Sequence, residues 1–291
     1  MSGEADPFHA HRGRLLGLAY RMLGSRADAE DAVQDAWLRW AACARGAVAN
    51  AEAYLVTTVT RICLDKLKSA RAKREIYVGP WLPEPVLDAD ALSPHAATEL
   101  AEDLSFALLL ALERLSPLER AAFLLHDVFD APYADVAETL GRSEEAVRQL
   151  ASRARKAVRD ERRALPATTE AHEKLIAAFV AAVATGDEAG LKALLREDAV
   201  TLSDGGGKRA AALNPICGAD KTARFLLGLA RKYAAAGAPL EPVAAIINGA
   251  PGLLLRINGA LDQAVCFSID GDRIAAIYIV RNPEKLGALM M

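Results

Sequence analysis

The sequence has few cysteines and no long apolar run. Its four cysteines, Cys43, Cys63, Cys217 and Cys266, are isolated, with no C-x-x-C pair and no histidine at metal-ligand spacing. This pattern predicts reduced thiols that pack as small apolar groups, and it argues against a metal site. Neither a secretory signal peptide nor an uninterrupted apolar run of about 18 residues occurs, so we expect a cytoplasmic protein with no membrane partner.

The chain also lacks an overall basic balance. Its formal net charge is −3 over 291 residues, so a nucleic-acid surface has to come from local segregation of charge. Residues 61–75 hold six basic residues against two acids, and residues 148–163 hold seven against two. Residues 76–113 hold seven acids and no Lys or Arg. We therefore expect two DNA contacts joined by an acidic connector, in a chain whose length predicts two or three domains.

Residues 131–163 are typical of two helices joined by a turn. Pro132 suits a first helical position, Gly141 the end of the first helix, and Ser143 the cap of the second. In the second helix an apolar stripe recurs at helical spacing, formed by Val147, Leu150, Ala151, Ala154 and Val158. The other face carries the candidate DNA-binding residues Arg148, Gln149, Ser152, Arg153, Arg155, Lys156 and Arg159. This pattern predicts a helix-turn-helix that enters a major groove, with a solvated amphipathic helix as the alternative.

Further helices are predicted before residue 78. One of them, over SRADAEDAVQDAWLRWAA, starts from a Ser25 cap and is expected to bury Trp37 and Trp40 while it exposes an acidic face. The next helix begins near Ala51 and changes from apolar to strongly basic along AYLVTTVTRICLDKLKSARAKRE. Because an acidic face repels DNA, it indicates a basic protein partner.

These two modules resemble regions 2 and 4 of the extracytoplasmic-function (ECF) sigma factors of bacterial RNA polymerase. The motifs are FHAHRGRLLGLAYRMLGSRADAEDAVQDAWLRW with the basic helix after it, and SPLERAAFLLHDVFDAPYADVAETLGRSEEAVRQLASRARKAVRD. The second begins with a predicted capping box of Ser116 and Glu119. The resemblance implies that Asp31, Gln34 and Asp35 bind core polymerase. It implies contacts with the melted −10 strand from Thr60, Arg61, Asp65, Lys66 and Lys68, and contacts with double-stranded −35 DNA from the basic face described above.

The predicted domains are two all-α helical sigma domains and a C-terminal α+β domain. We assign residues 1–78 to region 2, 79–95 to a linker, 96–165 to region 4 and 172–291 to the third domain. The linker contains the acidic stretch GPWLPEPVLDADALSP, whose prolines favour extended backbone. At this length it can reach roughly 50 Å, which helps the two modules to span a promoter.

The third domain is predicted to combine three helices with an antiparallel meander. The helices are expected over HEKLIAAFVAAVATGD, EAGLKALLRED and ADKTARFLLGLARKYAAAG, and early strands over AVTLSDGG and KRAAALNPI. Four strands follow, with turns at Asn248-Gly249, Asn258-Gly259 and Asp270-Gly271. This order resembles the SnoaL-like branch of the NTF2-like fold, a cone with a pocket between sheet and helices. WLPEP, DGGG and NPEKL together resemble the sigma-factor subgroup that carries such a domain.

We expect three separated segments to dock on one another and to regulate the chain. They comprise Trp81, Leu82 and Pro83 in the linker, Asp204, Gly205, Gly206 and Gly207 after a strand, and Asn282, Pro283, Lys285 and Leu286 near the C-terminus. An unpartnered tryptophan would leave burial worth roughly 2–3 kcal/mol unused. Lys208 and Arg209 are expected to meet the linker acids Glu84, Asp88 and Asp90.

Catalysis in the third domain is disfavoured because its predicted strands have few ionisable residues that could point into the pocket. His172 is its only histidine, Arg256 is the one inward-capable ionisable residue expected on its strands, and Asp262, Asp270 and Asp272 are expected in turns. We predict no catalytic residues and no cofactor, because a general base needs a carboxylate or imidazole inside the pocket.

The sequence therefore predicts an ECF sigma factor that directs RNA polymerase to promoters and is regulated in cis by its third domain. The predicted partners are the polymerase core, promoter DNA and a small-molecule or protein effector at the third domain. One alternative is a one-component helix-turn-helix regulator with an effector-binding cone, which has no need of the acidic helix face. The other is a SnoaL-like isomerase, cyclase or hydrolase fused to a DNA-binding module, which would need a catalytic dyad.

Overall fold

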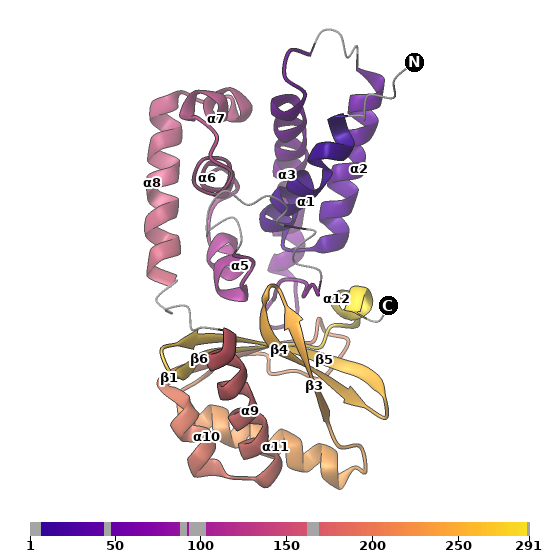
Figure 1. Cartoon of the computed structure of the whole chain (residues 1–291), viewed down its shortest axis with the longest axis vertical. Helices are drawn as coiled ribbons and strands as arrows, with labels where there is room; N and C mark the ends of the chain where they lie inside the picture. The colour runs from indigo at the N-terminus through magenta and orange to yellow at the C-terminus, as the bar shows by residue number, and fades with distance from the viewer. Residues whose placement is uncertain (1–6, 44–47, 88–91, 93–102, 162–168, 290–291) are drawn as a thin grey trace. The chain divides into compact units, whose positions relative to one another are not determined.

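The structure is a computed structural model that describes residues 7–43, 48–87, 92, 103–161 and 169–289 (Figure 1). The chain forms two compact units. Unit 1 comprises Met1–Glu75, Asp88–Leu104 and Leu108–Glu161, and unit 2 comprises Ile76–Leu87, Ser105–Ala107 and Arg162–Met291. The first half of the predicted linker thus belongs to the same unit as the third domain, and it is not a free spacer.

Unit 1 is helical and contains both predicted sigma modules. Its elements are α1 (Pro7–Leu23), α2 (Arg26–Ala42), α3 (Ala51–Glu75), α5 (Phe106–Glu113), α6 (Pro117–Phe123), the π-helical turn η3 (Leu124–Val128), α7 (Tyr133–Leu140) and α8 (Glu144–Glu161). The predicted caps are present: the Ser25 hydroxyl accepts the Asp28 amide at 3.2 Å, and Ser116 and Glu119 form the capping box. Gly141 ends α7 with a left-handed φ of 61°.

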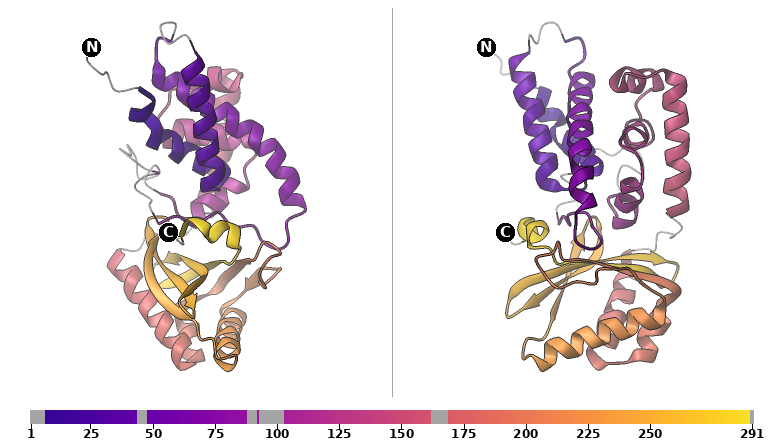
Figure 2. Two further views of the ribbon diagram at one scale, coloured as in Figure 1. Left: turned by 90° about the vertical axis from the view of Figure 1, so that its right-hand side faces the viewer. Right: turned by 180° about the vertical axis from the view of Figure 1, so that it is seen from behind.

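Unit 2 is an α+β domain, as predicted. Its helices are α9 (Thr169–Thr185), α10 (Glu188–Leu194) and α11 (Ala219–Ala235), followed at the end of the chain by α12 (Pro283–Leu286) and the short η4 (Gly287–Leu289). The strands are β1 (Leu195–Asp204), β2 (Ile216–Cys217), β3 (Glu241–Ile247), β4 (Ala250–Ile257), β5 (Ala260–Asp270) and β6 (Arg273–Val280), in the sheet order β2-β1-β6-β5-β4-β3. Helices α9, α10 and α11 lie along one face of this sheet (Figure 2).

The meander from β3 to β6 is antiparallel, and β1 closes onto β6 in parallel. Two of its turns have positive φ at both central residues, 54° and 77° at Asn248 and Gly249, and 52° and 76° at Asn258 and Gly259. Those angles are the ones a two-residue hairpin of right-handed twist requires, so the predicted Asn-Gly turns are confirmed.

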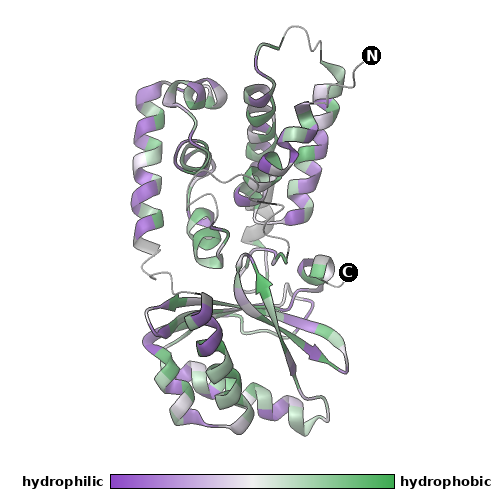
Figure 3. Ribbon diagram, in the orientation of Figure 1, coloured by the Kyte–Doolittle hydropathy of each residue, from purple (hydrophilic) through white to green (hydrophobic). Residues whose placement is uncertain are grey.

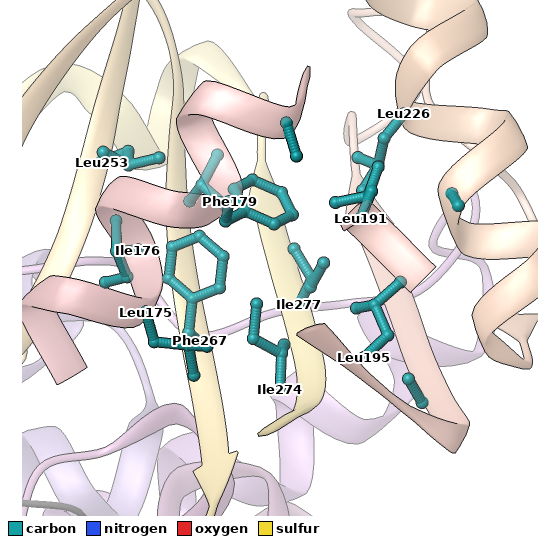
Figure 4. Packing of buried hydrophobic residues seen from close by; sticks show 14 of the residues in the cluster. Leu175, Ile176, Phe179, Leu191, Leu195, Leu226, Leu253, Phe267, Ile274 and Ile277 are labelled. Atoms are coloured by element: carbon teal, nitrogen blue, oxygen red, sulfur yellow. The ribbon is translucent and has the colours of Figure 1, made fainter. Parts of the chain in front are cut away.

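The core of unit 2 lies between the helices and the sheet. Phe179 and Phe267 meet edge to face, with ring centroids 5.3 Å apart, and Ile277 is fully buried beside them (Figure 4). Alternate residues of β5 and β6 point into this cluster, which is the two-residue period of a strand with one face on a core. The intervening residues face the other side of the sheet.

Several sequence predictions need correction. Trp37 is 39% exposed and is not a core residue. Pro132 is the N-cap of α7, one position before its expected place. The segment KRAAALNPI contributes only the start of the two-residue strand β2, since an irregular, mostly exposed stretch of 207–215 comes before it.

The packing predicts a large effect for Ile277→Ala. Because Ile277 is fully buried in the cluster, truncation leaves a cavity and should cost about 2–5 kcal/mol of local stability. Amide hydrogen exchange along β5 and β6 in the full chain measures this loss. Ile246→Ala is the matched control, since Ile246 is 47% exposed on β3, and equal effects of the two changes would contradict the assigned core.

Candidate functional site

The outer face of α2 is acidic and partly apolar. Asp31, Gln34 and Asp35 are all exposed, as predicted for a docking surface, and they adjoin the exposed side chains of Trp37 and Leu38. Carboxylates beside exposed large apolar groups suit a basic protein partner with apolar contacts of its own, and they do not suit DNA.

The predicted −10 residues of α3 separate into different environments. Arg61, Asp65 and Lys68 are exposed at i, i+4 and i+7 and so share one face. Lys66 points elsewhere, with its Nζ 3.7 Å from Asp31 on α2. Thr60 is fully buried, and its hydroxyl donates to the Val56 carbonyl at 2.8 Å. The structure therefore contradicts a surface position for Thr60, because the helical period turns it inward.

Arg61 is bound to the first helix of the helix-turn-helix. Its Nε donates to the Thr139 carbonyl at 3.2 Å, and a terminal nitrogen donates to the Glu138 carbonyl at 3.4 Å. The hydroxyls of Thr57 and Thr139 are 2.9 Å apart. These carbonyls belong to the last turn of α7, where the helix dipole favours a cation. In this arrangement of unit 1, Arg61 is engaged by region 4 residues.

Helix α8 presents most of the predicted −35 residues on one polar face (Figure 3). Arg148, Gln149, Ser152, Arg153, Lys156 and Arg159 are exposed, while Val147, Ala151, Ala154 and Val158 are buried. Arg155 differs, because its guanidinium donates to Asp127 at 2.5 Å and also to the Tyr133 hydroxyl. Arg155 thus connects α8 to η3 and α7. This structural role replaces the DNA contact that we predicted for it.

Arg148 is held at the start of the recognition helix. Its guanidinium carbon lies 4.3 Å from the centre of the Tyr133 ring, and it pairs with Glu144 at 3.1 Å. An arginine stacked on an aromatic ring keeps its edge donors available in a fixed plane.

The densest polar cluster of unit 2 surrounds Asp204. This carboxylate is fully buried at the end of β1, on the sheet face opposite to α9–α11. It accepts hydrogen bonds from the Tyr77 hydroxyl at 2.7 Å, the Leu82 amide at 2.9 Å and the Gly206 amide at 3.0 Å. Lys285 completes the set with an ion pair at 2.7 Å. A buried charge requires such compensation, and two of the four donors, Tyr77 and Leu82, come from residues 77–82.

Lys285 links the linker to the C-terminal segment. Its Nζ donates to the Leu82 carbonyl at 2.5 Å and lies 4.1 Å from the centre of the Trp81 ring and 5.0 Å from that of Tyr77. Burial together with the hydrogen bond to Asp204 raises the pKa of Tyr77, so its hydroxyl stays a donor throughout the neutral range.

The other end of the linker is fixed by a hairpin turn. The Val86 amide donates to the Asn248 side chain at 3.0 Å, and the Asn248 amide donates to the Val86 carbonyl at 2.7 Å. Leu82, Pro83, Glu84, Pro85 and Val86 are all buried between these two attachment points. We call the linker segment 77–86 with Asp204, Asn248, Asn282 and Lys285 the linker clamp.

The clamp explains the central glycine of DGGG. A Cβ on Gly206 would lie 2.3 Å from the Asn282 amide nitrogen, and Gly206 has a φ of 59°. Asn282 in turn donates to the Tyr77 hydroxyl at 2.9 Å. The close approach of the three segments therefore requires glycine at this position.

The structure brings together residues from all three predicted docking segments, and the sequence prediction missed two members of the clamp. Tyr77 lies just before the linker motif, and Asn248 was assigned only to a turn. Lys208 pairs with Glu284 and not with a linker acid as predicted; Glu84 is buried, and Asp88 and Asp90 lie outside the described residues.

Two predicted positions inside the third domain also need correction. Asp262 lies in β5, where it forms a nearly buried ion pair with Arg281 at 2.9 Å, and not in a turn. Arg256 is exposed and donates to the Gly259 carbonyl, so it does not point inward. The first difference arises because β5 begins at Ala260, directly after the Asn258-Gly259 turn, and so includes Asp262.

Burial raises the pKa of the Cys63 thiol to about 12, and it also raises that of Cys266. All four cysteines are free, but Cys217 is exposed and Cys43 half-buried, so only two of them are the apolar core groups that we predicted.

Burial lowers the pKa of His172, the histidine at the start of the third domain.

Among the described residues, no group of His, Cys, Asp and Glu has the arrangement of a metal site. None of the described helices is both long and apolar enough to cross a bilayer.

The chain is similar to known transcription proteins over almost its whole length. The family model described as Sigma-70 region 2 matches residues 8–73, and that described as Sigma-70, region 4 matches residues 105–158. The ECF RNA polymerase sigma factor SigJ of Mycobacterium tuberculosis is 41% identical, over 97% of this chain and 93% of the relative. The probable ECF RNA polymerase sigma factor SigI of the same species is 32% identical, over 97% and 94%. The crystal structure of SigJ aligns with a TM-score of 0.76 at 38% identity, covering 97% of this chain and 98% of SigJ.

The geometry of the clamp predicts the effect of Asp204→Asn. The change keeps the shape but leaves the Lys285 ammonium, 12% exposed, without its counter-charge, and breaking a buried pair in this way costs about 3–5 kcal/mol. Hydrogen exchange at the Leu82 amide should accelerate by about a hundredfold or more. Asp198→Asn is the control on the same strand, because Asp198 is exposed. Equal exchange in both variants would contradict the clamp.

Proposed function

Because the chain belongs to the ECF sigma factors, which direct RNA polymerase to specific promoters and initiate transcription, we propose that its third domain regulates that activity through the linker clamp. The proposed partners are the polymerase core and both promoter elements, and the proposed place of action is the cytoplasm. The buried Asp204 carboxylate carries the regulatory proposal, since its donors come from the linker and from the third domain together.

The core-binding surface proposed here is the exposed face of α2. Asp31, Gln34 and Asp35 supply charge and hydrogen-bonding groups, and Trp37 and Leu38 supply apolar area that is exposed in the free chain. An apolar centre beside charged residues is the usual composition of a specific protein interface.

The promoter-reading surfaces proposed here lie on α3 and α8. For the −35 element we retain the exposed residues Arg148, Gln149, Ser152, Arg153, Lys156 and Arg159, and for the −10 element Arg61, Asp65 and Lys68. Arg61 has to leave the carbonyls of α7 before it can reach a DNA strand. The free chain therefore holds one promoter-reading residue in an intramolecular contact, which polymerase binding would have to replace.

Regulation in cis follows from how the linker is held. The segment between α3 and region 4 is bound at Leu82 by Asp204 and Lys285, and at Val86 by Asn248. A linker fixed at two points cannot extend fully, so the span between the −10 and −35 modules depends on the state of the clamp. Intramolecular contacts act at high effective concentration, so each bond can be weak and still hold.

An enzymatic role is not proposed. In the described part of the third domain, the Asp204 carboxylate accepts hydrogen bonds from four donors, and the Asp262 carboxylate forms an ion pair with Arg281. A general base has to be available to take a proton from a substrate, and both carboxylates are instead held in ion pairs. A repressor without polymerase is also disfavoured, because it leaves the exposed acidic and apolar face of α2 without a use.

Run-off transcription with core polymerase tests the regulatory proposal in the full chain. Trp81→Ala removes the ring that Lys285 packs against, and Asp204→Asn removes the counter-charge, so each should change promoter output. Because both break one clamp, the double variant should differ little from either single variant. Additive effects would mean that Trp81 serves polymerase or DNA directly, and unchanged output in both would refute the regulation.

The reading face of α8 predicts two kinds of loss in promoter binding by the holoenzyme. Arg153→Ala should cost about 1–3 kcal/mol at a single −35 position, as for a bidentate base contact. Arg159→Ala should weaken all sequences alike and reduce the salt dependence, as for a phosphate contact. Fluorescence anisotropy over a set of −35 variants and salt concentrations measures both. Identical, sequence-independent losses would show that the assigned reading face is wrong.

A further inference from the structure

A cavity of about 630 Å³ lies inside unit 2, between α9, α11 and the sheet. Its walls are mainly apolar and include Phe179, Val183, Leu226, Leu253 and Val265. Cavities of this size and character bind small organic molecules, whose orientation is set by a few polar groups.

One polar side chain of the wall, that of Gln263, has no hydrogen-bond partner among the described residues. Gln263 is 1% exposed, and neither its amide nitrogen nor its amide oxygen has a hydrogen bond within the part of the chain that the structure describes. It pairs with Leu255 across β4 and follows the alternation of Val265 and Phe267, so its side chain is on the helix side of the sheet. A buried primary amide without partners is costly to the free protein, since it has lost water and gained nothing.

Two of the charged side chains near Gln263, Arg281 and Glu188, are paired within the protein. Arg281 is bound by Asp262 and by the Tyr233 hydroxyl at 2.6 Å, and it lines a smaller adjoining cavity of about 350 Å³ that Gln263 also borders. Glu188 and Arg231 stand at the opening of the main cavity, where both are exposed, and Glu188 pairs with Lys192 at 2.9 Å. Among the described residues the cavity interior therefore presents a neutral amide, and the cation Arg231 lies at the exposed opening.

We propose that this cavity binds a neutral, mainly apolar small molecule whose amide, or an equivalent group with a donor beside an acceptor, pairs with Gln263. The Gln263 side chain presents a donor and an acceptor side by side, so a carboxamide or lactam satisfies both atoms at once. A carboxylate satisfies only the donor and would enter an apolar space without a counter-charge. The bulge in β5 at Asp262 comes directly before Gln263, and bulges are common next to binding sites.

This site rests on the regulatory role proposed for the third domain, because a bound molecule would be the signal that the domain detects. Ligand binding is nevertheless measured in the absence of polymerase. A failed transcription test would leave the site intact, and a failed binding test would leave the linker clamp intact. The two proposals are therefore separable.

The test uses 2-naphthamide and 2-acetonaphthone, two probes of the same shape that differ by an amide NH₂ and a methyl group. The full chain should bind the amide about tenfold more tightly than the ketone in calorimetric titration, as expected for one additional buried hydrogen bond. Gln263→Leu should reduce this ratio to about one, and 2-naphthoate should bind more weakly than the amide. No binding of the amide, or the same preference in Gln263→Leu, would overturn the proposal.

The thermal midpoint of the unliganded variant is a second readout. Gln263→Leu removes two polar atoms without partners, so its midpoint should equal or exceed that of the parent chain. A lower midpoint would show that the amide is bonded within the protein, and it would overturn the premise. Val183→Trp fills the cavity and leaves Gln263 in place, so it should abolish binding of both probes.

Discussion

The structure of unit 2 depends on one buried charge. Asp204 has no access to water, so its carboxylate is stable only where donors surround it. Those donors are Tyr77, Leu82, Gly206 and Lys285, which come from three separate parts of the sequence. A single requirement for compensation therefore fixes the linker, the glycine loop and the C-terminal segment at once.

The distribution of charge in unit 1 separates its surfaces in the same physical terms. Acids on α2 repel DNA and attract a basic protein, whereas the exposed cations of α8 do the reverse. Lys66 of α3 lies close to Asp31 of α2, and Arg155 is withdrawn from the DNA face by Asp127. The charge of a cation alone does not show whether it faces DNA. Its position depends on the nearest carboxylate in the folded chain, which is Asp31 for Lys66 and Asp127 for Arg155.

The features predicted correctly from the sequence are those that depend on near neighbours. Capping by Ser25 and Ser116, the end of α7 at Gly141 and the Asn-Gly turns each involve residues within a few positions. The predictions that failed concern tertiary partners. Asn248 was recognised as a turn residue, but its bonds to Val86 join positions 162 apart, which no local pattern encodes. Thr60 was judged by its place in a motif, and the helical period buries it.

The two faces of the sheet treat polar groups in opposite ways, and this bears on how the third domain could sense a ligand. On one face the Asp204 carboxylate accepts from four donors, while on the other the Gln263 amide has no hydrogen-bond partner among the described residues. The two are connected by the end of β6, where the amides of Arg281 and Asn282 both donate to the Asp204 carbonyl. A ligand at Gln263 changes the clamp only if it binds the docked and released linker with different affinity, because a ligand with equal affinity shifts neither state. The short path through Arg281 provides a physical means for such a difference, since this side chain borders the adjoining cavity and its main chain holds the clamp.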